Sequence, residues 1–294
     1  MLEDLKFHVC RANRQLIDSY LAMFGYGCVS AINREAGVIA VRPDGVPLEE
    51  LRPDQIVICD LNGNLIEGEY APAREIKAHV ELYKTFPGCM SIANTRSKNT
   101  AAFAQSCKSI PPMGTLHADY FHGTIPVTRL LTKEELGEDF YKHVGITITE
   151  AFTGLSSYDV PAALVAQHGA FVWGRNPEAA VKLAEILETV AELAITSLNL
   201  TPGIAPISNA LLDRRYTDMA SAAPKKTQPA PKEDVKDSES GEENKAEQEA
   251  ATQAEEAVVT EEESIEETVV EVTDEASAEE TEAVNDEPEH EPAD

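Results

Sequence analysis

A predicted strand that runs through a turn into a predicted helix opens the most informative stretch of the chain, residues 89–129. The segment M-S-I-A at residues 90–93 is typical of a short strand, and Ser97 is placed to be the N-cap of the helix that follows. Side chains at the end of such a strand point into the crevice that a sheet opens there. In this chain those side chains are Asn94 and Arg96.

Helical and extended segments alternate through the first 216 residues. Helices are predicted from residue 2 to about 23, 72 to about 86, 97–105, 132 to about 154, 176 to about 200, and 207–216. Strands are predicted at residues 29–33, 37–42, 55–61, 65–67, 90–93, 162–166 and 170–173. Several of these strands follow one another as hairpins. The pattern favours an α/β layered domain with a mixed or antiparallel sheet over an all-parallel doubly wound one.

Two of the predicted helices begin with recognisable capping sequences. Thr132-x-x-Glu135 has the form of a capping box, although glycines at 137 and 145 weaken the helical pattern after it. Asn176 is followed by Pro177, which suits the first position of a helix.

The charge of the chain changes sharply near residue 221. Of the net charge of −28, residues 221–294 carry 26 acidic residues against five lysines, and they contain no aromatic residue. Such a segment cannot bury enough apolar surface to offset the entropy lost on ordering, so we predict that it is disordered. We therefore predict a folded domain at residues 1–220 and an acidic tail at 221–294, joined near a Pro- and Lys-rich linker at 222–232.

Several protein classes are disfavoured by composition. The five cysteines all lie in the first 220 residues, are odd in number and form no C-x-x-C, which indicates reduced thiols and no disulfide framework or zinc ribbon. The N-terminal segment lacks the apolar core of a signal peptide, and no run approaches the roughly 20 apolar residues of a membrane span. The negative charge disfavours nucleic acid. We expect a cytoplasmic protein with no membrane or nucleic-acid partner.

Six segments occur in the order and spacing of a known family: M-L-E-D-L-K, V-S-A-I-N-R-E-A-G-V, R-P-D-G-V, G-T-L-H-A-D-Y-F-H-G-T-I-P-V-T-R, H-G-A-F-V-W-G and N-A-L-L-D-R-R-Y. On these segments the chain resembles the class II aldolase/adducin family, and within it the L-ribulose-5-phosphate 4-epimerases. The resemblance implies a three-layer α/β/α sandwich around a mainly antiparallel central sheet. It also implies a homotetramer with active sites between neighbouring subunits. The acidic tail has no counterpart in this pattern.

The resemblance further implies zinc or another divalent metal held by three histidines, two from an H-x-H and one from an H-G-x-F segment. The metal would bind hydroxyl and keto oxygens of a sugar phosphate. In this chain the three positions hold Asn94, Arg96 and His168. One imidazole cannot hold zinc, and a protonated guanidinium cannot be a ligand. We therefore predict no metal cofactor, and we predict that Arg96 pairs with Glu75 in place of the ion.

The phosphate positions implied by the resemblance differ as well. Cys28 replaces an Asn, Asp44 replaces a Ser, and A-R-E at residues 73–75 replaces Ser-Ser-Asp. Asp44 opposes a phosphate by Coulomb repulsion, whereas Arg74 offers partial compensation, so anion binding stays open. Near the end of the domain, Arg215 stands at the position of a histidine.

The retained motif T-x-H-A-D-Y-F-x-G contains Thr115, His117 and Asp119, and Asp119 matches an acid/base aspartate of the family. One interpretation is that the retained family residues, Asp119 and His168, are inert. In the other, Asp119 or His168 moves a proton beside an anion-binding pocket. The candidates for that pocket are Arg74, Glu75, Asn94, Arg96, Thr115 and His117. A replacement metal site made of His117, His122 and His168 has no support in their spacing.

These substitutions leave two hypotheses for function. The first is a catalytically silent relative kept for assembly or binding, because metal ligands, phosphate contacts and C-terminal residues change together while core and turn motifs stay. The second is an active sugar-phosphate epimerase or aldolase with a metal-independent or rebuilt site. The acidic tail fits either one, as a solubility element or as a docking arm for a basic protein.

Overall fold

The computed structural model describes residues 2–221 of the chain. The predicted acidic tail lies outside the described residues, except for Ser221 at the end of the last helix. The expectations for the tail therefore stay predictions.

One seven-stranded sheet forms the centre of the domain, with the strand order β4-β3-β2-β1-β5-β7-β6. Every neighbouring pair in this sheet is antiparallel. The strands are β1 (Gly27–Asn33), β2 (Val38–Val41), β3 (Val57–Asp60), β4 (Leu65–Glu67), β5 (Ser91–Thr95), β6 (Ala162–Val165) and β7 (Gly169–Gly174). The predicted hairpins all form, so the predicted antiparallel sheet is confirmed.

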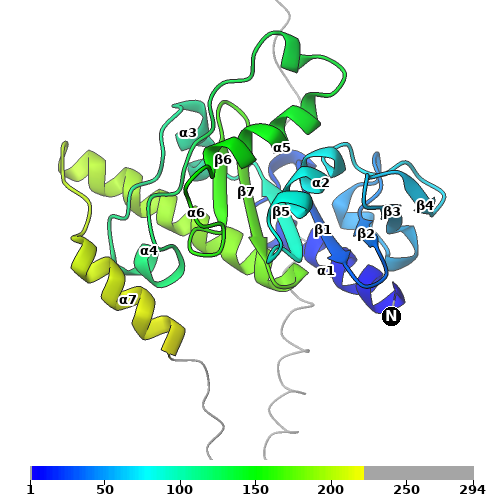
Figure 1. Ribbon diagram of the computed structural model, residues 1–294, viewed down its shortest axis with the longest axis horizontal. Helices are drawn as coiled ribbons and strands as arrows, with labels where there is room; N and C mark the ends of the chain where they lie inside the picture. Colours follow the sequence, from blue (N-terminus) through cyan, green and yellow to red (C-terminus); the bar gives the residue numbers. More distant parts are fainter. Residues whose placement is uncertain (1, 222–294) are drawn as a thin grey trace, which may run out of the picture. The chain divides into compact units, whose positions relative to one another are not determined.

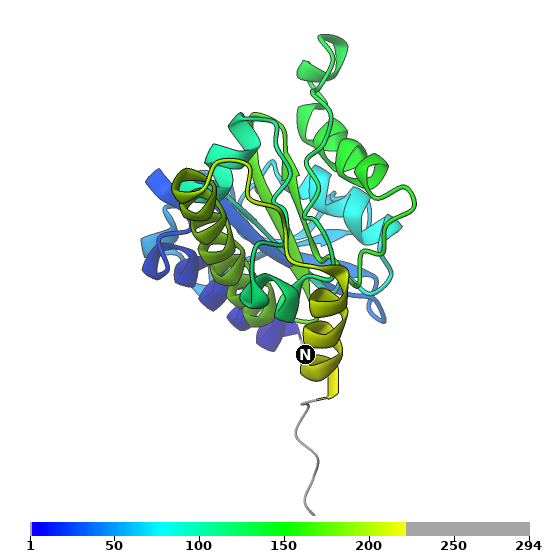
Figure 2. The same ribbon diagram turned by 90° about the vertical axis from the view of Figure 1, so that its left-hand side faces the viewer.

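Helices cover both faces of the sheet and complete the three-layer α/β/α sandwich that the sequence predicts. The helices are α1 (Leu2–Asp18), α2 (Ile76–Thr85), α3 (Lys98–Gln105), α4 (Thr115–Tyr120), α5 (Phe140–Ala151), α6 (Pro177–Leu200) and α7 (Asn209–Ser221). Figures 1 and 2 show α2 and α5 together on one face, and α1 and α6 with α3 on the other. The short helix α4 packs against α7 beside this body.

The central strands are buried along most of their length because helices lie on both sides of them. All five residues of β5 are buried, as are the first six of β1, whereas the edge strand β4 is exposed throughout. A sheet covered on both faces buries successive side chains, so its strands read as continuous apolar runs. The functional positions on β5 therefore lie inside the protein.

The longest helix, α6, begins where its capping sequence predicts. The side-chain Oδ1 of Asn176 accepts a hydrogen bond from the backbone N–H of Ala179 at 2.8 Å, and Pro177 occupies the first turn. This arrangement satisfies one of the backbone donors that a helix start leaves free. In the described part of the chain no helix combines the length and apolar character needed to cross a bilayer.

The helix predicted from Thr132 onward is divided in two, which corrects the sequence reading. Glu135 accepts the backbone N–H of Thr132 at 2.8 Å, as in half of a capping box, but this helix is only the short turn η4 (Glu134–Leu136). At Gly137 the backbone leaves the helical region, with ψ of −147°. The longer helix α5 then starts at Phe140.

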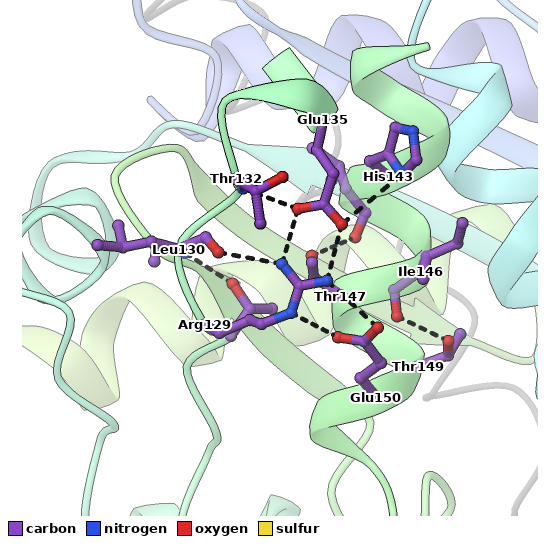
Figure 3. A network of polar contacts seen from close by, with 12 residues as sticks. Arg129, Leu130, Thr132, Glu135, His143, Ile146, Thr147, Thr149 and Glu150 are labelled. Carbon is purple, nitrogen blue, oxygen red and sulfur yellow. Dashed lines mark hydrogen bonds and ion pairs between the residues drawn. The ribbon is translucent and has the colours of Figure 1, made fainter. Parts of the chain in front are cut away.

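Arg129 joins the two pieces. Its guanidinium makes paired hydrogen bonds with Glu135 at 2.7 and 2.8 Å and reaches Glu150 of α5 at 2.8 Å (Figure 3). Hydrogen bonds from Arg129 lower the pKa of Glu135 to about 2, so this carboxylate is charged at neutral pH. The network holds the η4 segment against α5, the helix that carries part of the candidate site.

The first helix is shorter than predicted. α1 ends at Asp18, and the backbone then enters the left-handed region at Tyr20 and Phe24, with φ of 55° and 56°. These conformations cannot continue an α-helix. The predicted helix to about residue 23 is therefore corrected, and both aromatic side chains are exposed.

Candidate functional site

The centre of the candidate site is a row of side chains across three strands. In the sheet register, Asn94 of β5 lies opposite Cys28 of β1 and Phe171 of β7. Directly paired residues project from the same face, so these three side chains form one row. Strand β5 extends to Thr95, two residues beyond the prediction. Asn94 is therefore a buried strand residue, not part of the turn.

A buried hydrogen-bond chain holds Asn94 from the α2 side. His79 Nε2 donates to Asn94 Oδ1 at 3.0 Å, and Ser30 Oγ donates to His79 Nδ1 at 2.7 Å. Tyr83 in turn donates to Ser30 Oγ at 2.8 Å. Burial lowers the pKa of His79 to about 4, so its ring is neutral at pH 7 with one donor and one acceptor nitrogen. The only oxygen that Asn94 could offer to a metal is thus already engaged.

Arg96 lies one row further along the same face. Its guanidinium carbon is 4.6 Å from the centre of the Tyr26 ring, within the range of a cation–π contact. The described residues contain no ion pair between Arg96 and Glu75, so the predicted pairing is wrong. Arg96 follows the last residue of β5 and lies one residue beyond the Gly27–Thr95 pair, which places it beside Tyr26.

The position after His168, residue 169, has room only for glycine. A Cβ at this position would lie 2.4 Å from the Thr95 carbonyl oxygen and 3.3 Å from Cγ of Arg96. Only a residue without a side chain permits β7 to start this close to the end of β5. The H-G sequence thus brings His168 and Arg96 together.

His168 is enclosed by aromatic rings. Its ring lies 5.6 Å from Phe140, 6.0 Å from Tyr141 and 6.4 Å from Phe171, measured between ring centres. Burial, and then the positive charge of Arg96, lower the pKa of His168 to about 4. The imidazole is therefore neutral at pH 7, and its ring nitrogens make no hydrogen bond to any described residue.

Glu75 and Tyr141 complete this group. Glu75 immediately precedes α2 and is 9% exposed. Burial and then the charge of Glu75 raise the pKa values of both Cys28 and Tyr141, while Arg96 and Arg74 act in the opposite direction on Tyr141. Glu75 thus acts on both Cys28 and Tyr141, and Arg96 on Tyr141. The name "Arg96 cluster" denotes Cys28, Glu75, Asn94, Arg96, Tyr141 and His168.

The positions that the family resemblance assigns to phosphate binding carry charges of both signs. Arg74 is exposed, and its Nε lies 3.4 Å from Oδ2 of Asp44. The ion pair joins these two charges to each other, and anion binding at Arg74 stays a prediction. The charge of Arg42 opposes the rise in the pKa of Cys28, and the buried Nε of Arg42 has no hydrogen-bond partner among the described residues.

The turn after Arg96 is fixed by a residue from α6. Ser97 is the N-cap of α3, as predicted, but its side chain donates to Glu188 at 2.6 Å and does not cap the helix. The Glu188 carboxylate also accepts the backbone N–H groups of Asn99 at 2.6 Å and Thr100 at 3.0 Å. A negative charge at a helix N-terminus is favourable, so Glu188 acts as the cap of α3.

The remaining candidates lie on α4, which the sequence did not predict as a helix. Both oxygens of Asp119 are bound by Arg215 of α7, at 2.8 and 2.9 Å. His117 is buried and donates to the carbonyl of Gly123 at 2.6 Å, and Thr115 is exposed. None of the contacts of Asp119 or His117 within the described residues reaches the Arg96 cluster. The structure thus divides the predicted pocket into two groups.

The residues at the metal-ligand positions do not fit zinc. Within residues 2–221, no three His, Cys, Asp or Glu side chains are grouped to hold a metal ion. The Asn94 oxygen is bound to His79, and the guanidinium of Arg96 is always protonated. The replacement triad does not form either, because His122 is instead bound to Asp213 at 2.7 Å.

Sequence reasoning missed Tyr141 as a residue of this site. Tyr141 lies in the first turn of α5, next to Phe140, with no motif to mark it. An aromatic pair at the start of an amphipathic helix is typical of a core. Only the packing of α5 against α2 and β6 brings this side chain to His168.

Comparisons with known proteins agree with this fold. Residues 7–195 match the family model described as "Class II Aldolase and Adducin N-terminal domain". The chain is 36% identical over 215 residues to the L-ribulose-5-phosphate 4-epimerases UlaF of Salmonella paratyphi A and Salmonella typhi, covering 73% of this chain and 94% of each of those proteins.

Solved structures of aldolases share the architecture. An L-fuculose 1-phosphate aldolase superposes with a TM-score of 0.64 at 20% identity, covering 74% of this chain and 96% of that one. The L-fuculose-1-phosphate aldolase from Thermus thermophilus gives a TM-score of 0.54 at 20% identity, covering 68% of this chain and 98% of that one. At this identity the likeness concerns the fold. Together with the family match, it shows that the chain belongs to the class II aldolase and adducin family.

Proposed function

We propose that this domain does not perform metal-dependent sugar-phosphate chemistry and that it serves a binding or assembly role. The proposal rests on Asn94 and Arg96, which stand at two positions where the family resemblance implies metal-binding histidines. Asn94 Oδ1 accepts a hydrogen bond from His79, and Arg96 places a permanent positive charge near His168. A divalent cation at this place would be repelled by the guanidinium and would find a single free imidazole.

The ion pair of Asp119 supports the same proposal. An acid/base catalyst must gain and lose a proton, with its pKa near the working pH. Two charge-assisted hydrogen bonds from Arg215 occupy both oxygens of Asp119. The retained aspartate is therefore engaged as a structural partner of α7.

The alternative is an active sugar-phosphate epimerase or aldolase with a rebuilt, metal-independent site. The identity of 36% to UlaF and the coverage of 94% of that protein favour this alternative. The neutral imidazole of His168 and the carboxylate of Glu75 could each accept a proton near Arg96. Such a site would stabilise negative charge with Arg96 and Asn94 in place of a metal.

Metal analysis and turnover on L-ribulose 5-phosphate separate the two functions. We expect wild-type protein to contain no stoichiometric zinc or manganese and to show no epimerisation with either metal added. The double substitution Asn94→His with Arg96→His supplies the two missing imidazoles and serves as the positive control for metal uptake. Stoichiometric zinc in wild-type protein, or turnover that a chelator abolishes, contradicts the proposal. Metal-independent turnover favours the alternative.

We also propose a cytoplasmic homotetramer, with the acidic tail as a docking arm for a basic protein. Light scattering after size exclusion measures the assembly, and a monomer at micromolar concentration contradicts it. A chain cut after residue 220 tests the tail: retention of a basic partner should be lost with the tail, and for the full chain it should weaken at high salt. Unchanged retention by the shortened chain removes the docking role.

A further inference from the structure

Glu75 and Asn94 of the Arg96 cluster are more than nine-tenths buried, and each has a polar group without a partner among the described residues. Glu75 is 9% exposed, and its carboxylate makes no hydrogen bond or ion pair with any described residue. Asn94 is 4% exposed, and its amide oxygen is bound to His79 while its NH₂ group has no partner among the described residues. Among the described residues, the fully buried side-chain atoms without a partner are Arg42 Nε and His117 Nδ1, so the unpaired groups of Glu75 and Asn94 still reach solvent. Two largely buried side chains that present unpaired polar groups to solvent in one cluster indicate a place where a ligand supplies hydrogen bonds.

The two groups and Arg96 are arranged around one place in the fold. Glu75 lies one helical turn before His79, whose backbone N–H donates to the Glu75 carbonyl at 3.2 Å and whose Nε2 donates to Asn94 at 3.0 Å. Tyr141 contacts the ring of His168, and His168 follows the same strand turn that brings Gly169 against Arg96. Arg96 lies just after β5, the strand that carries Asn94, so these contacts connect the residues of the cluster.

The guanidinium of Arg96 has its N–H groups available. The Tyr26 contact uses the flat face of the guanidinium, so its N–H groups, which lie in the plane, are directed elsewhere. They form no hydrogen bond or ion pair with any described residue. Arginine N–H groups match the two oxygens of a carboxylate.

The combination of groups restricts the chemistry of a ligand. Three groups of the cluster are hydrogen-bond donors: the charged guanidinium of Arg96, the NH₂ group of Asn94 and the hydroxyl of Tyr141. Glu75 only accepts hydrogen bonds when it is ionised, so it repels a bare anion and favours a hydroxyl group. A metal ion is disfavoured by Arg96. A molecule that joins an anionic group to a hydroxyl satisfies both sides.

We propose that the Arg96 cluster binds a small hydroxycarboxylate, whose carboxylate contacts Arg96 and the Asn94 amide and whose hydroxyl donates to Glu75. This inference rests on the proposed binding role, because the ligand occupies the place that a metal would need. The inference adds to the proposed binding role the class of ligand that would be bound.

The test uses the full chain and D,L-glycerate as the probe, with two matched controls. Glycerol has hydroxyls without a carboxylate, and propionate has a carboxylate without a hydroxyl. Glycerate at 100 times its Kd should raise the thermal midpoint by about 5 °C or more, and neither control should do so at the same concentration. Calorimetric titration gives the Kd of each compound.

Two substitutions test the assigned contacts. Arg96→Gln should weaken glycerate binding by about 30-fold or more, because it removes the charged partner of the carboxylate. Glu75→Gln should weaken the preference for glycerate: it removes the repulsion, so propionate should bind more tightly and its disadvantage relative to glycerate should shrink. Arg52→Gln is the control, since Arg52 is exposed and pairs with Asp54 on the surface. Circular dichroism verifies that each variant is folded.

The outcomes separate this inference from the proposed function. Absence of glycerate binding, or equal binding by wild type and a folded Arg96→Gln protein, overturns the inference and leaves the metal-free role in place. An unchanged preference in Glu75→Gln also overturns the assigned hydroxyl contact. Zinc-dependent epimerisation refutes the proposed function whatever glycerate does.

Discussion

His79 should make the stability of this domain depend on pH between 7.5 and 4.5. The ring is fully buried in the chain Tyr83–Ser30–His79–Asn94, and its pKa is lowered from 6.5 to about 4. The folded protein therefore does not take up the proton that the unfolded chain accepts below pH 6.5. The stability that neutral His79 contributes is complete above pH 6.5 and is lost as the pH falls towards 4.

The size of the effect follows from the pKa difference. A shift of one unit corresponds to about 1.4 kcal/mol, so a fall from 6.5 to about 4 is worth about 3 kcal/mol in total. About 2.5 kcal/mol of this is lost by pH 4.5. His79→Gln removes the titrating group and keeps a donor towards Asn94, but it loses the acceptor for Ser30. At pH 7.5 this loss should cost about 1–3 kcal/mol.

Urea unfolding of both proteins between pH 7.5 and 4.5 measures this difference, at one fixed protein concentration. The emission of Trp173, the single tryptophan of the chain, follows unfolding because the ring is buried against Phe86 and Phe152. His168 titrates in both proteins, so it cancels in the comparison. The wild type should be the more stable protein at pH 7.5, and the gap should close or reverse by pH 4.5. Parallel pH profiles would refute the assignment of a neutral buried ring.

Three further substitutions have expected outcomes. Gly169→Ala should destabilise the domain by about 2–4 kcal/mol in urea unfolding, because its Cβ would lie 2.4 Å from a backbone oxygen, whereas Gly88→Ala, with no atom within 4 Å, should change stability by less than about 1 kcal/mol. Asn176→Ala should cost about 1 kcal/mol by the same measurement, since it removes the cap of α6, and an unchanged midpoint would contradict the assigned role. Arg215→Met should speed amide exchange in α7, because Asp119 loses both of its hydrogen bonds. Arg214→Met is its control, with a single long contact to Asp218 at 3.7 Å, and equal exchange in the two variants would show that the Asp119 pair does not hold α7.

The sheet was predictable because its signals are local. Buried strands with turn residues between them, and the Asn176–Pro177 start of α6, are properties of a few neighbouring residues. Helix α4 has no such signal: it is six residues long, and its partner α7 lies about ninety residues further along the chain. The break at Gly137 was only suggested by glycine, since the Arg129 contacts that separate η4 from α5 are tertiary.

The candidate site was predictable in part of its residues, without Tyr141, and not in its contacts. Asn94 and Arg96 could be assigned to the site because they lie near the end of a predicted strand. The predicted pairing of Arg96 with Glu75 was wrong because the register of β1 against β5 places Tyr26 beside Arg96. Likewise, the acceptor for Arg215 could not be read from the sequence, because α4 and α7 meet only in the folded domain.

The cap of α3 has a consequence for how the domain is made. Glu188 supplies the acceptor for Ser97, Asn99 and Thr100, although it is synthesised about ninety residues later. A ribosome that has released only the first half of the chain has therefore produced β5 without the residue that fixes the turn after it. Arg96 gains its final orientation only when α6 emerges and docks, so assembly of the cluster is a late event in biosynthesis.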